Sequence, residues 1–434
     1  MSATVVGGGL AGCEAAWALA ERGVWVTLHE MRPVRGTPAH QTDSLAELVC
    51  SNSFKSVETV NAHGLLKAEM RLLGSVILQA ADAARVPGGA ALAVDRAAFA
   101  GAVQERIAGH PNITVVRDEV MDLPTPAIIA TGPLTSDALS AAIAARLGAK
   151  ALAFFDAIAP IVSTESLDHT GHTRLFRASR YGKGGGDDYL NAPFTEVEYD
   201  AFVAALREGD QYAPNHEFDQ VQYFEGCLPV EEMAARGRDV LRFGPMKPVG
   251  LTDPRTGGQA FAVLQLRQED RAGQMWNLVG FQTRLRKGEQ QRVFRMVPGL
   301  GAAEFLRYGS IHRNAYLNAP ASLTPHLSAR DDQALLFAGQ LTGVEGYTES
   351  SATGILAGIN LARILAGEAP LIPPPTTMCG ALYRYLREAD PAHFQPMNAN
   401  FGLLEPLASP PRDKAKKKLQ LAERALADMK AFAA

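Results

Sequence analysis

The residues best suited to chemistry are a glycine-rich segment near the start of the chain and two isolated thiols. The segment reads Gly7-Gly8-Gly9-Leu10-Ala11-Gly12, and its GxGxxG spacing lets a backbone approach a pyrophosphate. Cys50 lies where an apolar run turns into a polar loop. Cys227 stands two residues before Pro229, and the acids that follow indicate the start of a helix. A helix N-terminus lowers the pKa of a nearby thiol, so Cys227 is a candidate nucleophile.

The elements around the glycines are those that a dinucleotide site requires. Residues 4–6 predict a strand, residues 13–22 an alanine-rich helix, and residues 24–30 a second strand that ends in an acid. The third glycine, Gly12, lets the helix pack close to the first strand, and the amides at the helix N-terminus face the phosphates. Glu30 is placed to bind a ribose hydroxyl. The sequence therefore predicts a bound dinucleotide.

Two downstream segments indicate which dinucleotide this is. Residues 127–132 predict a strand that ends in Ala-Thr-Gly, and residues 335–340 predict another that leads into a small-residue-rich helix at about 350–365. The set resembles the α/β glutathione-reductase-type FAD-binding fold, which is Rossmann-like and returns to its first unit at the flavin. The predicted cofactor-binding residues are Gly7, Gly8, Gly9, Leu10, Ala11, Gly12, Glu30, Met31, Arg32, Thr131, Gly132, Gly339, Gln340, Gly343, Glu345, Gly346 and Tyr347.

Composition excludes several classes of protein. The formal net charge of -4 gives no overall nucleic-acid signal, and no run of eighteen apolar residues predicts a membrane span. The four cysteines form no CxxC motif, so we expect no metal site. The chain opens directly on a strand with no basic leader, so we expect no signal peptide, and scattered thiols suit a reducing cytoplasm.

Local charge points to an anionic partner. Basic residues gather in three clusters, and each alone could be a solvated face. Together, on an acidic protein, three such clusters are consistent with an anionic macromolecular partner. The residues that we take as candidates for RNA binding are Arg174, Arg177, Arg180, Lys183, Arg284, Arg286, Lys287, Lys416, Lys417 and Lys418.

The chain divides into three parts by composition. Residues 1–172 read as the first part of the FAD-binding domain, and residues 173–294 as an inserted α+β substrate domain rich in Tyr and Phe. Residues 295–434 return to the FAD-binding domain and end in a basic helix at 414–432. No second strand-GxGxxG-helix unit is visible, so NAD(P)H would have to visit the flavin transiently.

Longer motifs carry a more specific resemblance. The chain is similar over essentially its whole length to the folate- and FAD-dependent tRNA (uracil-5-)-methyltransferases, which are related to the glucose-inhibited-division type of tRNA-modifying flavoproteins. The motifs are His29-Glu30-Met31-Arg32-Pro33, Cys50-Ser51-Asn52-Ser53-Phe54, Gly64-Leu65-Leu66-Lys67-Ala68-Glu69-Met70, Asn191-Ala192-Pro193-Phe194, Phe224-Glu225-Gly226-Cys227-Leu228-Pro229, Gly244-Pro245-Met246-Lys247-Pro248-Val249-Gly250-Leu251 and Gly343-Val344-Glu345-Gly346-Tyr347.

The resemblance implies a reaction that needs a flavin and two thiols. A thiolate adds to carbon 6 of uracil, and the resulting enolate takes a one-carbon unit from methylenetetrahydrofolate. Reduced FAD, recharged by NAD(P)H, supplies two electrons, so 5-methyluridine forms without S-adenosylmethionine. By motif the two cysteines of the family correspond to Cys50 and Cys227. We assign Cys227 as the attacking thiolate and Cys50 as its partner near the flavin.

The resemblance also implies a folate pocket and a tRNA partner. Phe176, His312 and Glu345 are the candidates to contact folate. The target uridine lies in the T loop of the tRNA and must be extruded into the pocket, while basic residues hold phosphates. Alternatives are a flavin enzyme that modifies wobble uridine, a flavin oxidoreductase acting on a small molecule, and a non-catalytic RNA-binding flavoprotein.

Overall fold

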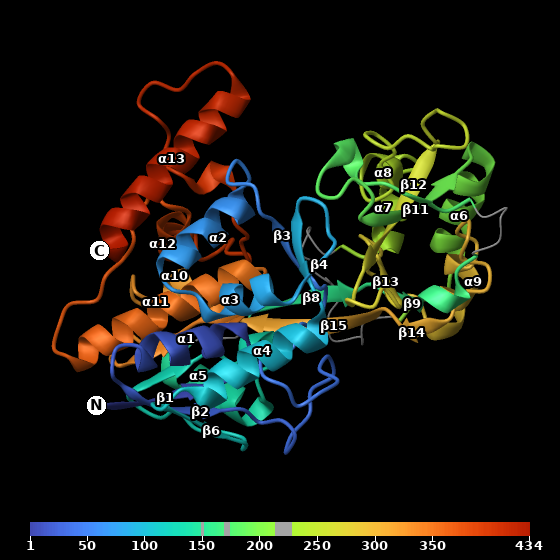
Figure 1. Ribbon diagram of the computed structural model, residues 1–434. Helices are drawn as coiled ribbons and strands as arrows, with labels where there is room; N and C mark the ends of the chain where they lie inside the picture. Colours follow the sequence, from blue (N-terminus) through green and yellow to red (C-terminus); the bar gives the residue numbers. More distant parts are fainter. Residues whose placement is uncertain (149–151, 169–173, 213–227) are drawn as a thin grey trace.

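The computed structural model describes residues 1–148, 152–168, 174–212 and 228–434, with the backbone alone at 152–158 and 311–314. Cys227 therefore lies outside the described residues. The chain forms two lobes that lie beside each other, joined by the long strands β8 (Leu152–Ile158) and β15 (Ser310–Tyr316) (Figure 1). These two strands pair antiparallel over their whole length.

The first lobe is built on a five-stranded parallel sheet with the order β16-β7-β1-β2-β6. Its strands are β1 (Ser2–Val6), β2 (Trp25–His29), β6 (Ile113–Val116), β7 (Ala127–Ile129) and β16 (Leu335–Phe337). The strands predicted at 4–6, 24–30, 127–132 and 335–340 are all present. Strands β7 and β16 are wholly apolar and buried, as expected of a parallel sheet that is covered on both faces. The α/β class and the Rossmann-like arrangement are confirmed.

Two helices from opposite ends of the sequence pack tightly over this sheet. They are α1 (Leu10–Ala20) and α11 (Tyr347–Leu365). Small residues allow this approach, since a Cβ on Gly354 would lie 2.2 Å from the carbonyl oxygen of Ala11. The small-residue-rich helix predicted at about 350–365 is therefore α11, which begins three residues earlier. Its composition reflects close helix packing.

The remaining helices and a small sheet complete the first lobe. The helices are α2 (Ala62–Leu72), α3 (Val76–Ala83), α4 (Arg96–Gly109), α5 (Asp137–Leu147), α10 (Ala319–Ser322), α12 (Met378–Glu388) and α13 (Lys414–Ala433). A three-stranded antiparallel sheet of order β3-β5-β4 contains β3 (Ser53–Ser56), β4 (Arg85–Val86) and β5 (Ala91–Val94). The second half of α13 packs on α2, and its first half projects from the lobe (Figure 1).

The second lobe is built on a six-stranded antiparallel sheet of order β10-β11-β12-β13-β9-β14. Its strands are β9 (Ile161–Ser163), β10 (Phe176–Arg177), β11 (Tyr189–Phe194), β12 (Ala262–Gln268), β13 (Met275–Leu278) and β14 (Phe305–Arg307). Its helices are α6 (Glu196–Glu208), α7 (Val230–Arg236), α8 (Val240–Phe243) and α9 (Lys287–Phe294). Side chains of these helices and alternate residues of β12 share one apolar core.

The second lobe is the α+β unit expected between residues 173 and 294. Two of its strands, β9 and β14, lie just outside that range. They extend directly from the connecting strands β8 and β15. The sheet of the second lobe therefore includes strands on both sides of the predicted range 173–294. The boundaries 1–172, 173–294 and 295–434 remain a proposal.

Candidate functional site

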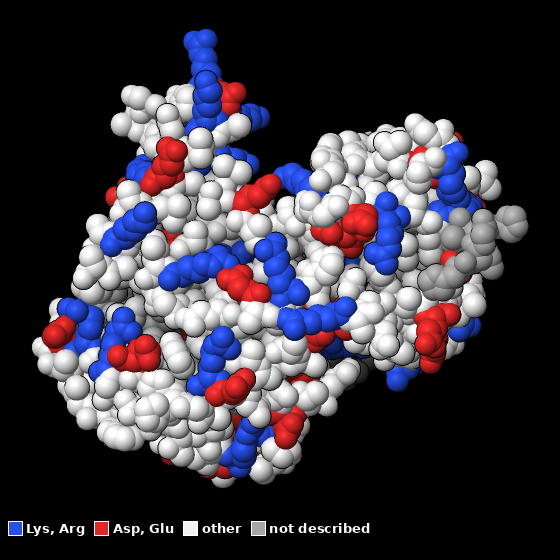
Figure 2. All heavy atoms as spheres, viewed as in Figure 1, with Lys and Arg blue, Asp and Glu red and all other residues white. Residues whose placement is uncertain are grey.

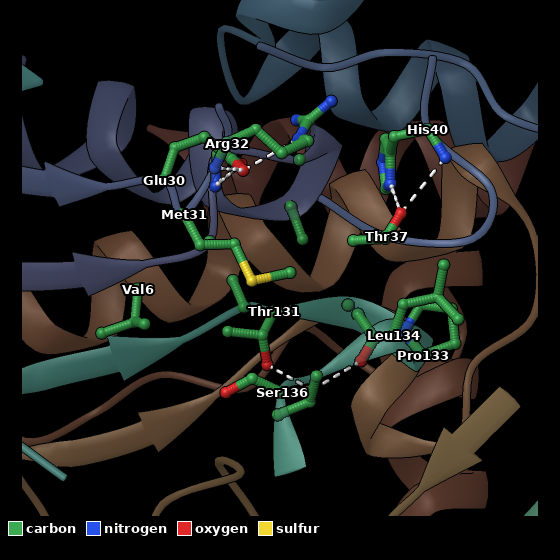
Figure 3. A pocket seen from close by; sticks show the side chains of 18 of the residues that line it. Val6, Glu30, Met31, Arg32, Thr37, His40, Thr131, Pro133, Leu134 and Ser136 are labelled. Carbon is green, nitrogen blue, oxygen red and sulfur yellow. Dashed lines mark hydrogen bonds and ion pairs between the residues drawn. The ribbon is translucent and has the colours of Figure 1, made fainter. Parts of the chain in front are cut away.

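A cavity opens at the carboxyl ends of the parallel strands of the first lobe, where open α/β sheets bind their ligands (Figure 3). It encloses about 1040 Å³ of empty space, part of which is open to solvent. Thirteen of the predicted cofactor-binding residues line it: Gly7, Gly8, Gly9, Leu10, Ala11, Glu30, Met31, Arg32, Thr131, Gly132, Gly339, Gln340 and Tyr347. Segments more than 330 residues apart in the sequence thus meet around one cavity.

The glycine-rich loop has the geometry of a phosphate cradle. Gly7 adopts a φ of +106°, which favours glycine, and a Cβ on Gly12 would lie 1.7 Å from the carbonyl oxygen of Gly7. By contrast, a Cβ on Gly9 would meet nothing within 4 Å. The backbone at Gly9 is therefore open to a ligand at the N-terminus of α1. These residues fit a dinucleotide pyrophosphate.

Glu30 is buried at the end of β2 and holds the loop in place. Its carboxylate accepts hydrogen bonds from the Gly8 amide at 3.0 Å, the Arg32 amide at 3.0 Å and the Arg32 Nε at 2.8 Å. Burial by itself would raise the pKa of Glu30, but the hydrogen bonds and charge of Arg32 outweigh it and lower the pKa. The carboxylate is ionised next to the cradle, as a ribose ligand should be. The ribose contact itself stays a prediction.

Three predicted cofactor residues and Gly12 do not line the cavity. Gly343 and Gly346 adopt φ values of +90° and +112°, and a Cβ on Gly343 would lie 2.4 Å from the Phe394 ring. Glu345 is buried, with its amide donating to the carbonyl of Met397 and its carboxylate accepting from Gln340. These residues shape the turn that starts α11. The cofactor roles predicted for them remain untested.

The cavity also has polar residues that the sequence motifs did not single out. Thr37, His40 and Ser136 are labelled in Figure 3, and Glu47 and Thr135 also line the cavity. The Thr37 hydroxyl and the His40 Nδ1 lie 2.6 Å apart. Burial, aided by Arg32, lowers the pKa of His40 to about 4, so its imidazole is neutral at pH 7. Thr37 and His40 could have been suspected from the sequence, because they follow closely after Glu30, the predicted ribose-binding acid.

The loop that carries Cys50 passes beside this cavity. Its neighbour Val49 lines the cavity, as does Tyr347 at the start of α11. The Tyr347 hydroxyl accepts hydrogen bonds from the amides of Cys50 at 2.8 Å and Ser51 at 3.1 Å. Cys50 itself is half-buried, whereas Cys13 and Cys379 are buried. Of the thiols within the described residues, Cys50 alone is partly open to solvent, as a reactive thiol needs to be.

Three arginines from both lobes hold this loop. Arg96 of α4 donates to the carbonyls of Leu48 and, at 3.1 Å, Cys50. Arg307 of β14 donates to the carbonyl of Val49 at 2.7 Å. Arg267 of β12 bonds the side chains of Ser51 and Asn52, each at 2.8 Å. The loop is therefore positioned at the junction of the two lobes.

The other predicted catalytic and folate residues lie apart from the cavity or outside the described part. Cys227 lies outside it, but α7 begins at Val230 with Pro229 before it, so the predicted helix start is confirmed. His312 pairs with Asp156 across the two long strands, and its side chain is outside the described part. Phe176 is buried in the second lobe in a small cluster with Leu251 and Val263. Its contact with folate remains a prediction.

Most of the basic side chains predicted to bind RNA contact other residues of the protein. The partner of Arg174 is Glu198, whose pKa it holds at about 2 through hydrogen bonds. Arg180 donates to the side chain of Gln265 and to two backbone carbonyls. Three more form ion pairs, Lys183 with Glu58, Arg284 with Glu232 and Arg286 with Asp210. The other two lie over aromatic rings, Arg177 over Trp276 and Lys287 over Tyr308. Their roles in tRNA binding remain a prediction.

The lysines of α13 differ from these clusters. Lys416, Lys417 and Lys418 are exposed on the projecting half of the helix (Figure 1). No ion pair involves them within the described residues, although the ammonium of Lys418 lies 5.8 Å from the centre of the Phe401 ring. Basic and acidic side chains are mixed around the hollow between this projection and the second lobe (Figure 2). This helix is the predicted basic element best placed to meet an anionic partner.

Within the described ranges, no three His, Cys, Asp or Glu side chains gather as metal ligands would. The helices of the same ranges include none with the length and hydropathy to cross a bilayer.

Comparisons with known proteins show the family to which the chain belongs. The family model "Glucose inhibited division protein A" matches residues 2–369. "Methylenetetrahydrofolate--tRNA-(uracil-5-)-methyltransferase TrmFO" of Geobacter sulfurreducens is 56% identical over 98% of this chain and 97% of its own. The protein of the same name from Anoxybacillus flavithermus is 53% identical over 100% and 99%. The Aquifex aeolicus GidA structure superposes with a TM-score of 0.68 at 16% identity, over 99% of this chain and 74% of that one. The chain therefore belongs to the glucose inhibited division protein A family, together with the TrmFO proteins that it matches from end to end.

Proposed function

We propose that this protein is a folate- and FAD-dependent tRNA (uracil-5-)-methyltransferase that forms 5-methyluridine in the T loop. The observation that carries the proposal is the identity of 56% with a relative of that name over nearly the full length of both chains. The geometry supports it, since a dinucleotide cavity and the loop of a half-buried thiol share Val49 and Tyr347. The cytoplasmic location stays a prediction.

The cavity would hold FAD, with its pyrophosphate at Gly9 and the N-terminus of α1. When bound, FAD supplies the two electrons that convert the methylene unit of methylenetetrahydrofolate into a methyl group. NAD(P)H would be the source of those electrons. The N-terminus of α11, at Tyr347, would lie near the flavin, where its dipole favours negative charge.

In this proposal the two thiols have separate tasks. Cys227 adds to carbon 6 of the uracil, and Cys50 acts as its partner. The Cys50 amide donates to the Tyr347 hydroxyl, the Cys50 carbonyl accepts from Arg96, and the carbonyl of the neighbouring Val49 accepts from Arg307, so the backbone that carries the thiol is held on both sides. Fixed geometry of this kind contributes directly to rate. Glu345, His312 and Phe176 stay as candidates for the folate contact.

Single substitutions of the cysteines test the proposal. The assay measures methyl incorporation into unmodified tRNA transcript with NAD(P)H, with and without methylenetetrahydrofolate, and locates the modified base. Cys227→Ala should abolish methylation while bound FAD and tRNA affinity stay close to wild type. Cys379→Ala is the matched control, because that thiol is buried in α12 and should be dispensable.

Two results would contradict the proposal. Methylation by the Cys227→Ala variant would show that another group attacks the uracil. Product at a wobble uridine, or no RNA product with a flavin still reducible by NAD(P)H, would favour the wobble-uridine enzyme or a small-molecule oxidoreductase. The Aquifex aeolicus GidA structure does not decide between these enzymes, since at 16% identity it shows the fold alone.

A further inference from the structure

An exposed tyrosine on the second lobe has an unusual setting. Tyr181 is 68% exposed and adopts a φ of +57°, a conformation that costs a side-chain-bearing residue about 1 kcal/mol or more. It belongs to a short turn, Arg180–Gly182, followed by a glycine-rich loop at 184–186. Strained residues persist where the surrounding structure holds them, and they gather at ligand sites. The setting of Tyr181 therefore calls for a physical reason.

The structure fixes this ring from one side only. The Tyr181 amide donates to the carbonyl of Gly250 at 2.9 Å. A Cβ on Gly250 would lie between 2.8 and 3.0 Å from the ring atoms Cζ, Cε1 and Cε2. Nearly equal distances to three ring atoms mean that a face of the ring, not its edge, rests on the glycine. The opposite face is open to solvent, so the ring forms a flat platform.

The turn that carries this platform is anchored at both ends. Arg180 donates to the carbonyls of Lys247 and, at 3.0 Å, Val249. Beyond the turn, Lys183 contacts Glu58 of the first lobe at 2.6 Å. Glu58 follows β3, which continues from the Cys50 loop. The platform is thus rigid, and its loop reaches the junction of the lobes where the candidate thiol lies.

The segment that supports the ring also carries an exposed aromatic and an exposed basic side chain. Residues 243–251 also expose Phe243, which is 74% accessible, and Lys247, which has no ion pair among the described residues. Asp187 and Asp188 belong to the adjoining loop, and the Asp188 carboxylate accepts from the Gly89 amide at 2.6 Å. Aromatic faces interleaved with cations are the pattern by which proteins hold unpaired nucleotides.

We propose that the outer face of Tyr181 stacks on an unpaired base of the tRNA substrate, with Lys247 contacting a neighbouring phosphate. The proposal rests on the proposed function, because it takes tRNA as the partner. Stacking explains why a large ring is kept exposed and rigid in a strained turn, since every base presents a π face. A tRNA loop supplies such bases, whereas a continuous duplex does not.

The test compares tRNA dissociation constants of single variants by fluorescence anisotropy at several salt concentrations. Tyr181→Gly removes the ring without adding strain at a φ of +57°. It should weaken binding of unmodified tRNA about 5- to 100-fold and leave the slope of log Kd against log salt unchanged. Tyr181→Phe should bind as wild type. Lys247→Gln should reduce the slope by about one.

Matched controls separate stacking from a general loss of structure. Trp25→Ala removes another exposed aromatic side chain, 59% accessible, from β2 of the first lobe and should leave the Kd unchanged. Binding of a blunt RNA duplex should be equal for wild type and Tyr181→Gly. Bound FAD and the urea midpoint report folding.

The possible failures can be told apart. If Tyr181→Gly binds tRNA within twofold of wild type, or loses as much affinity for the duplex, the stacking proposal is overturned while the methyltransferase assignment stands. If the wild-type protein binds no tRNA, the proposed function itself fails.

Discussion

The contact between Arg96 and Glu269 should govern both the stability of the lobe junction and the rate of methylation. Arg96 Nε lies 2.6 Å from Glu269 Oε2, and the two side chains are 20% and 1% exposed. The same guanidinium donates to the carbonyls of Leu48 and Cys50. One side chain thus neutralises a buried carboxylate and positions the loop of the candidate thiol.

Arg96→Met should lower the free energy of unfolding by about 3 kcal/mol. Removing one partner of a buried ion pair costs about 3–5 kcal/mol, and the lower end applies because Arg96 is partly exposed. The variant should still fold, because native proteins are stable by about 5–15 kcal/mol. Methylation should fall at least about tenfold, because a catalytic group displaced by about 1 Å can cost about a hundredfold in rate.

A second substitution separates the two effects. In Arg96→Met with Glu269→Gln, no buried charge lacks a partner, so at least about 2 kcal/mol of the lost stability should return. Activity should stay low, because the carbonyls of Leu48 and Cys50 still lack their donor. Urea unfolding, bound FAD and methyl incorporation are measured on wild type, the two single variants and the double variant. Recovery of full activity together with stability would refute the positioning role of Arg96.

Three further predictions concern packing, pH and salt. Gly354→Ala should unfold at a lower urea concentration and retain less FAD, because its Cβ would lie 2.2 Å from the Ala11 carbonyl oxygen. The control is Gly101→Ala in α4, where a Cβ meets nothing within 4 Å, and its free energy of unfolding should rise by about 0.5 kcal/mol. Equal effects of the two substitutions would contradict the packing argument. Burial raises the pKa of Glu69 from 4.5 to about 7, so its contribution to stability is full below pH 4.5 and is lost as the pH rises through 7. As the pH rises from 5 to 8, the free energy of unfolding measured in urea should therefore fall for wild type relative to Glu69→Gln. A difference between the two proteins that does not change with pH would refute the raised pKa of Glu69. Replacing the three exposed lysines of α13 (416–418) with Gln should reduce the slope of log Kd for tRNA against log salt by up to about three, whereas an unchanged slope would mark a merely solvated face.

The glycine-rich cradle and the strands around it could be predicted from the residue pattern. The GxGxxG segment, its flanking strands and Glu30 are close in sequence, so local propensity and backbone geometry decide their arrangement. The return of the chain to the same cavity was also predictable, because residues 335–347 continue a buried strand into a helix start. Thirteen of the predicted cofactor residues line one cavity for this reason.

The contacts that hold the Cys50 loop could not be predicted in this way, because they join distant parts of the chain. Arg96, Arg267 and Arg307 reach the Cys50 loop from 46 to 258 residues away in the sequence. An arginine has the same local pattern whether it faces water or a buried carbonyl, so periodicity could not identify these three. Likewise, the ion pair between Arg174 and Glu198 joins residues 24 positions apart, and the basic cluster alone did not indicate it. Long-range pairing depends on how the two lobes meet, and no short stretch of sequence contains that information.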